Sequence, residues 1–110
     1  MRKSKKERLE KKGWKVGSVQ DFLGLSDEEA AYVELRLRLA DSLRRRRRKQ
    51  NLSQSELARR ISSSQSRVAK MEGGDPSVSL DLLIRSLLAL GASNRDLART
   101  ISSASLRKAS

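Results

Sequence analysis

LSQSELARRISSSQSRVAKMEGG, residues 52–74, contains two helix-start signals in close succession. Ser53-Gln-Ser-Glu56 is a capping box, which predicts a short helix over Gln54–Ile61. Ser64 can cap a second helix, Gln65–Glu72, which ends at Gly73-Gly74. Two short helices joined by a turn of a few small residues have the geometry of a helix-turn-helix, so the sequence predicts this motif over residues 53–72.

The segments on either side of the motif also carry helix signals. Upstream, the capping box Ser26–Glu29 opens a helix that runs to about Gln50 without a Gly or Pro. Downstream, Ser79 caps a helix over Leu80–Leu90, and a further box at Ser93–Asp96 opens a last helix over Asn94–Ile101. Apolar residues recur at helical spacing along the long upstream helix, at Tyr32, Leu35, Leu39 and Leu43.

The sequence therefore predicts an all-α fold, a five-helix helix-turn-helix bundle with an extended first helix. Residues 1–26 form a basic arm and an apolar, aromatic leader, partly ordered, with an irregular hook or short strand over 13–25. We expect residues 27–101 to form the helix-turn-helix domain and residues 102–110 to form a flexible tail.

The composition favours a polyanionic partner and argues against catalysis. The chain has 25 Lys and Arg against 13 Asp and Glu, a net charge of +12. This charge favours a protein that binds nucleic acid over a basic protein whose charge serves only solubility. A membrane surface is the other polyanion that such a chain could bind. There is no Cys or His, so neither a disulfide nor the commonest metal ligands and general bases are present. We expect no enzyme activity, no catalytic residue, no cofactor and no metal site. Without a long apolar run or a secretory signal, we expect a cytoplasmic protein with no membrane partner.

The start of the second short helix carries side chains suited to reading bases. Gln pairs with adenine and Arg pairs bidentately with guanine, whereas Ser and Lys are more permissive. The residues expected to contact base edges are Gln65, Ser66, Arg67 and Lys70. Arg67 could also be an ordinary surface residue, and Lys70 suits a phosphate as well as a base.

Other residues are expected at the DNA backbone. Ser53 and Gln54 stand at a helix start, where backbone amides and the helix dipole favour a phosphate, and Ser64 holds the same place on the next helix. The run Arg44–Lys49 is either a solvated helix end or a set of backbone contacts, for which Arg44 and Arg48 are the candidates.

Residues 52–91 resemble the Xre, or lambda-repressor-like, helix-turn-helix domain. The matching features are Leu52, Gln54, Glu-Leu-Ala at 56–58, Ser-Gln-Ser at 64–66, Glu72-Gly-Gly, Ser79-Leu80 and the Leu-rich helix that ends at Gly91. The resemblance implies that Gln65–Glu72 enters the major groove and that Arg47 pairs with Glu72 as a structural brace. Arg46 and Arg48 depart from the pattern, because such domains often bury an apolar residue there; either is solvated or faces phosphate.

The segment GWKVGSVQDFLGLSDEEAAYVELRLRLADSLR, residues 13–44, is similar to the leader of HigA-like antitoxins. This resemblance implies a homodimeric repressor that binds double-stranded operator DNA and neutralises a RelE- or HigB-like ribonuclease toxin. Trp14, Phe22 and Tyr32 would contact the toxin or the dimer mate, although such aromatics also pack on their own domain. The alternatives are a free-standing repressor without a toxin, and an adaptor that binds protein and non-specific nucleic acid.

Overall fold

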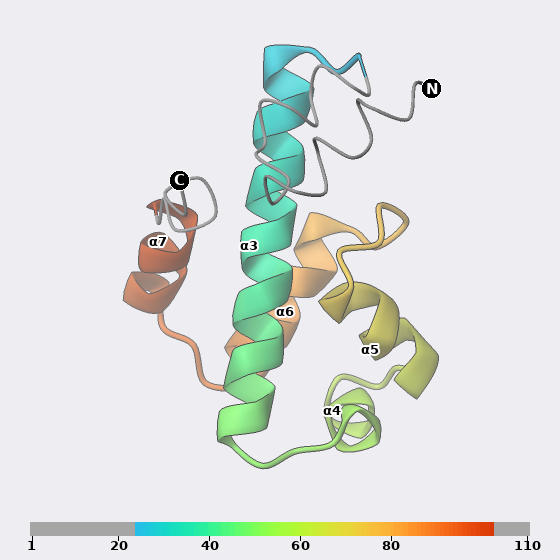
Figure 1. Ribbon diagram of the computed structural model, residues 1–110. Coiled ribbons are helices and arrows are strands. Elements are labelled where there is room, and N and C mark those ends of the chain that lie inside the picture. Colours follow the sequence, from blue (N-terminus) through green and yellow to red (C-terminus); the bar gives the residue numbers. More distant parts are fainter. Residues whose placement is uncertain (1–23, 103–110) are drawn as a thin grey trace, which may run out of the picture. The chain divides into compact units, whose positions relative to one another are not determined.

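The computed structural model of the protein describes residues 24–102, and within this range it contains helices and no strand. The predicted leader, with Trp14 and Phe22, and the predicted tail from residue 103 lie outside the described residues. The helices are α3 (Asp27–Lys49), α4 (Gln54–Arg60), α5 (Gln65–Glu72), α6 (Leu80–Ala89) and α7 (Asn94–Ser102) (Figure 1). These five described helices confirm the predicted all-α helix-turn-helix bundle with a long first helix.

The chain divides into two compact units, and the boundary falls inside α3. The first unit is described over residues 24–34. There the Ser26 hydroxyl accepts the Glu29 amide at 3.1 Å, and the Glu29 carboxylate accepts the Ser26 amide at 2.9 Å. This reciprocal pair satisfies two of the amide groups that a helix start leaves without partners. The second unit, Leu35–Ser103, contains the rest of α3 and the four shorter helices.

The core of the second unit lies where α3, α4, α5 and α6 meet. Seven of its apolar side chains are almost completely buried: Leu39, Leu43, Leu57, Val68, Met71, Leu83 and Leu87. On α3, α5 and α6 they recur at three- or four-residue spacing, so one face of each of these helices is removed from water. Ala58 is also buried, and its small side chain lies on α4 where α4 packs against α5.

The turn after α5 requires glycine at one position. Gly74 has φ +74°, and a Cβ atom placed on it would lie 2.6 Å from Cδ2 of Leu37 on α3. Both the left-handed backbone and the close approach exclude a larger residue without rearrangement. The chain can therefore turn tightly off the end of α5 and continue along α3.

Helix ends differ from the prediction by a single residue. α4 ends at Arg60 and α6 at Ala89, because Ile61 and Leu90 are C-caps with non-helical backbone angles. α3 ends at Lys49, and α7 continues to Ser102. Among the described residues, no helix is both long enough and apolar enough to span a membrane.

Candidate nucleic-acid interface

α5 is buried on one side and carries exposed polar side chains on the other. Val68 and Met71 have no exposed surface, which fixes the helix against the core. The four residues that the sequence predicts at base edges are all exposed: Gln65, Ser66, Arg67 and Lys70. The structure thus brings these four residues together on the exposed part of a helix that packs against the core through Val68 and Met71.

The first turn of α5 is organised by Ser64. Its hydroxyl oxygen accepts the amide of Arg67 at 3.2 Å and lies 3.3 Å from the hydroxyl of Ser66. Such a cap stabilises a helix by about 1 kcal/mol. It fixes the backbone of Arg67 at the solvent-facing start of the helix.

The end of α5 is tied to α3 by an ion pair. The Nε and Nη2 atoms of Arg47 lie 2.5 and 2.9 Å from the Glu72 carboxylate oxygens, and the Nη1 atom donates to the Leu52 carbonyl at 2.7 Å. The two side chains are only 10% and 4% exposed. Hydrogen bonding to Glu72 raises the pKa of Arg47 above its ordinary value, in spite of burial, which acts in the opposite direction. This fork geometry fixes the angle between α3 and α5.

The same carboxylate continues into a chain of side-chain amides. Gln54 on α4 donates to Glu72 at 3.1 Å, and Gln65 on α5 donates to the Gln54 oxygen at 2.6 Å. The sequence predicts Gln54 at a phosphate; its carbonyl oxygen and one hydrogen of its amide group are bonded within the protein, and the second amide hydrogen is not used by these two contacts. Because both contacts cross between helices, no local sequence signal identifies them.

α4 starts with the capping box that the sequence predicts. The Ser53 hydroxyl accepts the Glu56 amide at 3.0 Å, and the Glu56 carboxylate accepts the Ser53 amide at 2.7 Å. Hydrogen bonds to this carboxylate from the backbone amide of Ser53, and then from its side chain, are the main reason why the pKa of Glu56 lies below its ordinary value. The box fixes the start of α4, where Gln54 is positioned beside α5.

A hollow of about 330 Å³ lies beside the outer face of α5 and extends to the loop after it. Its lining consists of hydroxyl, cationic and apolar side chains: Ser64, Ser66, Arg67, Lys70, Ser77 and Val78. Ser77 is a lining residue that no sequence pattern singled out as part of the site. Asp75 accepts the Ser77 amide at 2.8 Å, and the hydrogen bonds from Ser77 lower the pKa of Asp75. The sequence Asp-Pro-Ser at residues 75–77, which is typical of a turn, is therefore the feature from which the position of Ser77 could have been predicted.

Arg36 holds this loop from beneath. Its side chain is buried, and its Nη1 atom donates to the carbonyl oxygen of Val78 and, at 3.4 Å, to that of Asp75. The loop that carries Ser77 is thus attached to α3, in the same unit as α5.

The cations of residues 44–49 do not act as one group. Arg47 is buried in the brace, whereas Arg44 and Arg48 are exposed. Arg44 pairs with Asp41 at 3.2 Å. Arg46, one of the two departures from the family pattern, is partly exposed and pairs with Asp96 of α7 at 3.3 Å, while Arg48 is exposed, as either water or a phosphate would require.

The remaining candidates lie away from α5 or outside the description. Tyr32 is 44% exposed on α3, in the first unit. Trp14 and Phe22, its predicted companions, are not among the described residues. Over residues 24–102, no group of His, Cys, Asp and Glu side chains could hold a metal ion.

Residues 38–100, more than half of the chain, match a family of proteins described as the helix-turn-helix domain. No curated protein and no solved structure matches the chain. The matched residues contain all of α4, α5 and α6, with parts of α3 and α7. The chain belongs to the helix-turn-helix domain family and is a DNA-binding protein of that class.

Proposed function

We propose that the protein is a transcriptional repressor that reads double-stranded operator DNA with the outer face of α5. One observation carries the proposal: Gln65, Ser66, Arg67 and Lys70 are exposed together on a helix that is anchored to the core by the completely buried side chains of Val68 and Met71. A helix placed in the major groove presents such side chains to base edges. The rigid backing matters, because a loosely held helix would lose entropy on binding.

The Gln54–Gln65 contact supports a defined role for Gln65. Gln54 accepts one hydrogen of the Gln65 amide, at 2.6 Å, which leaves the second N–H and the carbonyl oxygen for a ligand. One donor beside one acceptor is the pattern that binds adenine bidentately. Gln54 is thus a positioning residue for Gln65. Arg67 presents a fork of donors that suits guanine, and Lys70 would select a base edge or a nearby phosphate.

Backbone contacts would hold the duplex in register around this helix. The hydroxyls of Ser53 and Ser64 accept backbone amides at the starts of α4 and α5, so both residues lie where the free amides of a helix start would meet a phosphate. Arg44 and Arg48 would add charge at the end of α3, and Ser77 would close the hollow beside α5. Phosphate contacts fix orientation and carry no sequence information, so specificity rests on α5.

A homodimer would place two α5 helices about 34 Å apart on a palindromic site. The experiment is an anisotropy titration of duplex from the protein's own promoter against a scrambled duplex, at two salt concentrations. We expect the promoter to bind about a thousandfold more tightly. Arg67→Ala should remove about 1–3 kcal/mol of that preference. Arg85→Ala, on exposed Arg85 of α6, removes the same charge elsewhere and should leave the preference intact.

Equal binding of both duplexes, fading together with salt, would contradict the repressor proposal. The chain would then be an adaptor whose charge binds nucleic acid non-specifically. A loss of preference in Arg85→Ala as large as that in Arg67→Ala would also contradict it, because net charge alone would explain the effect.

The physiological setting that we propose is a toxin–antitoxin pair. The chain would neutralise a RelE- or HigB-like ribonuclease and repress its own operon. Support comes from the leader resemblance and from exposed Tyr32, an aromatic of the kind that anchors interfaces. Co-purification with the product of a neighbouring small gene tests this setting. Promoter binding without such a partner would indicate a free-standing repressor.

A further inference from the structure

The cationic side chains of residues 44–49, at the end of α3, lie on opposite sides of the helix. Successive residues of an α-helix are about 100° apart, so Arg45 and Lys49 lie about 160° from Arg47 around the axis. Arg47 faces α5 through its contact with Glu72. Figure 1 shows α4 and α5 on one side of the C-terminal half of α3 and α7 on the other. Arg45 and Lys49 therefore face away from the helix-turn-helix.

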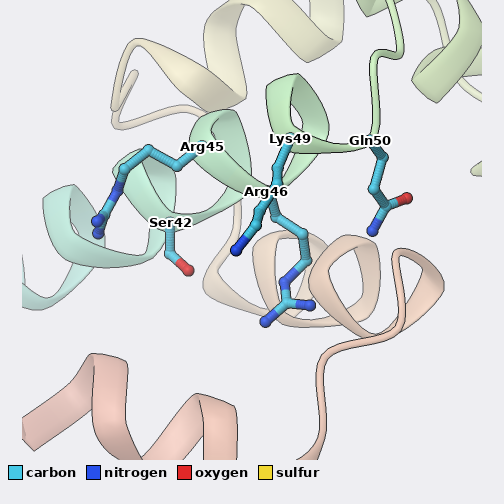
Figure 2. Close-up of a pocket in the computed structure, with 5 residues that line it drawn as sticks. All are labelled: Ser42, Arg45, Arg46, Lys49 and Gln50. Atoms are coloured by element: carbon cyan, nitrogen blue, oxygen red, sulfur yellow. The ribbon is translucent and has the colours of Figure 1, made fainter.

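A hollow of about 350 Å³ lies on this far side. Its lining residues are Ser42, Arg45, Arg46, Lys49 and Gln50. Figure 2 shows the side chains of Ser42, Arg46 and Lys49 of α3, and of Gln50 in the turn after it, extending into the same space, with Arg45 at its edge. Apart from the carbonyl oxygen of Gln50 and the hydroxyl oxygen of Ser42, every polar side-chain atom in this set is a donor.

Two of these side chains are already held in place. Gln50 donates to the Leu90 carbonyl at 2.7 Å, and the hydroxyl oxygens of Ser42 and Thr100 lie 3.4 Å apart. The Nε atom of Arg46 is buried and has no hydrogen-bond partner among the described residues. An anion with several acceptor oxygens would satisfy such a set of donors.

The charge around the hollow is positive overall. Asp41 pairs with Arg44 and Arg45, and Asp96 pairs with Arg46 and Arg99. Four guanidinium groups thus share two carboxylates. Lys49 adds a further positive charge and has no ion pair within the described part of the chain. The pair Arg45–Asp41 is open to water, with Arg45 71% exposed, so Arg45 can turn to another anion at little cost.

We infer that the hollow is a second phosphate-binding site, separate from the α5 interface. Guanidinium and ammonium groups with a hydroxyl suit the oxygens of a phosphate. Two sources can supply that group: the backbone of a second DNA duplex, or a free phosphate compound. If the phosphate belongs to a second duplex, one protein molecule could bridge two DNA segments, which the α5 face alone could not do.

The test uses the full chain in two arms. In the first, protein saturates a short biotinylated duplex on a surface, and capture of a second, fluorescent duplex is measured. In the second, pyrophosphate is titrated into isotope-labelled protein and the amide signals of Lys49 and Gln50 are followed. The variants are Arg45→Ala, the double variant Arg45→Ala with Lys49→Ala, and Arg85→Ala. Arg85 is a matched control, because it is 75% exposed and pairs with Asp81 at 3.0 Å, as Arg45 pairs with Asp41 at 3.0 Å.

We expect the double variant to capture about tenfold less second duplex than wild type, and Arg45→Ala to show part of that loss. The salt slope for the second duplex should fall by about 0.9 for each contact removed. Arg85→Ala should behave as wild type, and all variants should bind the first duplex normally. A pyrophosphate response that the double variant loses, with no capture of a second duplex by wild type, would assign the site to a free phosphate compound.

Two results would overturn the inference. In one, neither probe distinguishes the double variant from Arg85→Ala. In the other, the double variant loses the first duplex in the same proportion as the second, which would place these cations in the α5 interface. Failure of promoter specificity, by contrast, would leave the inference standing, because it concerns α5 alone.

Discussion

α5 and α7 have similar lengths, eight and nine residues, but the bundle holds them in different ways. α5 inserts Val68 and Met71 into the core without any exposed surface, and its Glu72 is fixed by Arg47. Burial of this kind stabilises a helix by roughly 1.5–3 kcal/mol for each large apolar side chain. α5 is therefore held by apolar packing that does not depend on salt or pH.

α7 has no buried residue, although Leu97 packs partly against the core. Its links to α3 are polar. Arg46 pairs with Asp96 at 3.3 Å, Arg38 donates to the Ile101 carbonyl at 2.7 Å, and Thr100 donates to Ser42 at 3.4 Å. Contacts of this type, between partly or fully exposed side chains, contribute little each, and the ion pair weakens in salt. From this difference we expect α5, the helix proposed to contact bases, to be the more rigid of the two, and α7 to detach locally without unfolding of the core.

The largest difference between the two helices should appear when an apolar side chain is truncated on each. Met71→Ala should lower the free energy of unfolding by about 2–5 kcal/mol, because it leaves a cavity in the core. Ile101→Ala should change it by less than about 0.5 kcal/mol, because Ile101 is 44% exposed. Urea denaturation followed by circular dichroism measures both values. Equal losses in the two variants would show that α7 is part of the core.

A second comparison removes the charge of one carboxylate on each helix. Glu72→Gln should cost about 3 kcal/mol, because it leaves the buried guanidinium of Arg47 without a counter-charge. Asp96→Asn should leave global unfolding near wild type, since Asp96 and Arg46 are each 28% exposed and Arg99 is 69% exposed, so that water and salt screen both pairs. Thermal melts at low and high salt provide the measurement. A salt-dependent loss in Glu72→Gln, or a large one in Asp96→Asn, would reverse the distinction.

The N-caps allow a smaller change on each helix. Ser64 caps α5 and Ser93 caps α7, and each hydroxyl accepts a backbone amide, at 3.2 and 3.0 Å. Ser64→Ala should lower global stability by about 1 kcal/mol. Ser93→Ala should instead speed hydrogen exchange of the α7 amides alone, because α7 opens locally. Hydrogen exchange resolved by residue tests both, and faster exchange throughout the molecule in Ser93→Ala would count against local opening.

The sequence predicted the helices well because their starts are local. Each Ser cap bonds an amide three residues further on, as at Ser53, Ser64 and Ser79, so the signal lies within one turn of the chain. Helix ends were displaced by a residue, since Ile61 and Leu90 look helical by type and act as caps through their backbone. The apolar spacing also identified the core residues Leu39 and Leu43.

The site was predicted only in part because its contacts join separate helices. Nothing near Gln54 in the sequence indicates that its amide is shared between Gln65 and Glu72. The sequence predicts phosphate contacts for Arg44 and Arg48 within the cationic run but gives no role to Arg45, which the helix places beside a hollow on the side opposite to Arg47. Resemblance to a family supplied the Arg47–Glu72 pairing, which local patterns do not contain. The remaining contacts of the site depend on how the helices pack against one another, which the sequence patterns do not predict.

The smallest expected effect concerns acid. Hydrogen bonds from the Ser93 amide and hydroxyl, with help from Arg46 and Arg99, lower the pKa of Asp96 below its ordinary value. A carboxylate whose pKa is lower in the folded state stabilises that state fully above the unfolded pKa, about 3.9, and loses this contribution as the pH falls through the folded value.

Acidification from pH 7 should therefore leave α7 attached until the pH drops below about 4, and then release it while α5 still holds its apolar contacts. Amide signals of α7 and α5 in a pH titration measure the order of release. Asp96→Asn provides the control, because its α7 should already be loosened at neutral pH and should respond less to acid. Simultaneous release of both helices in wild type would mean that α7 depends on the core rather than on Asp96, and the contrast between the two helices would then concern burial alone.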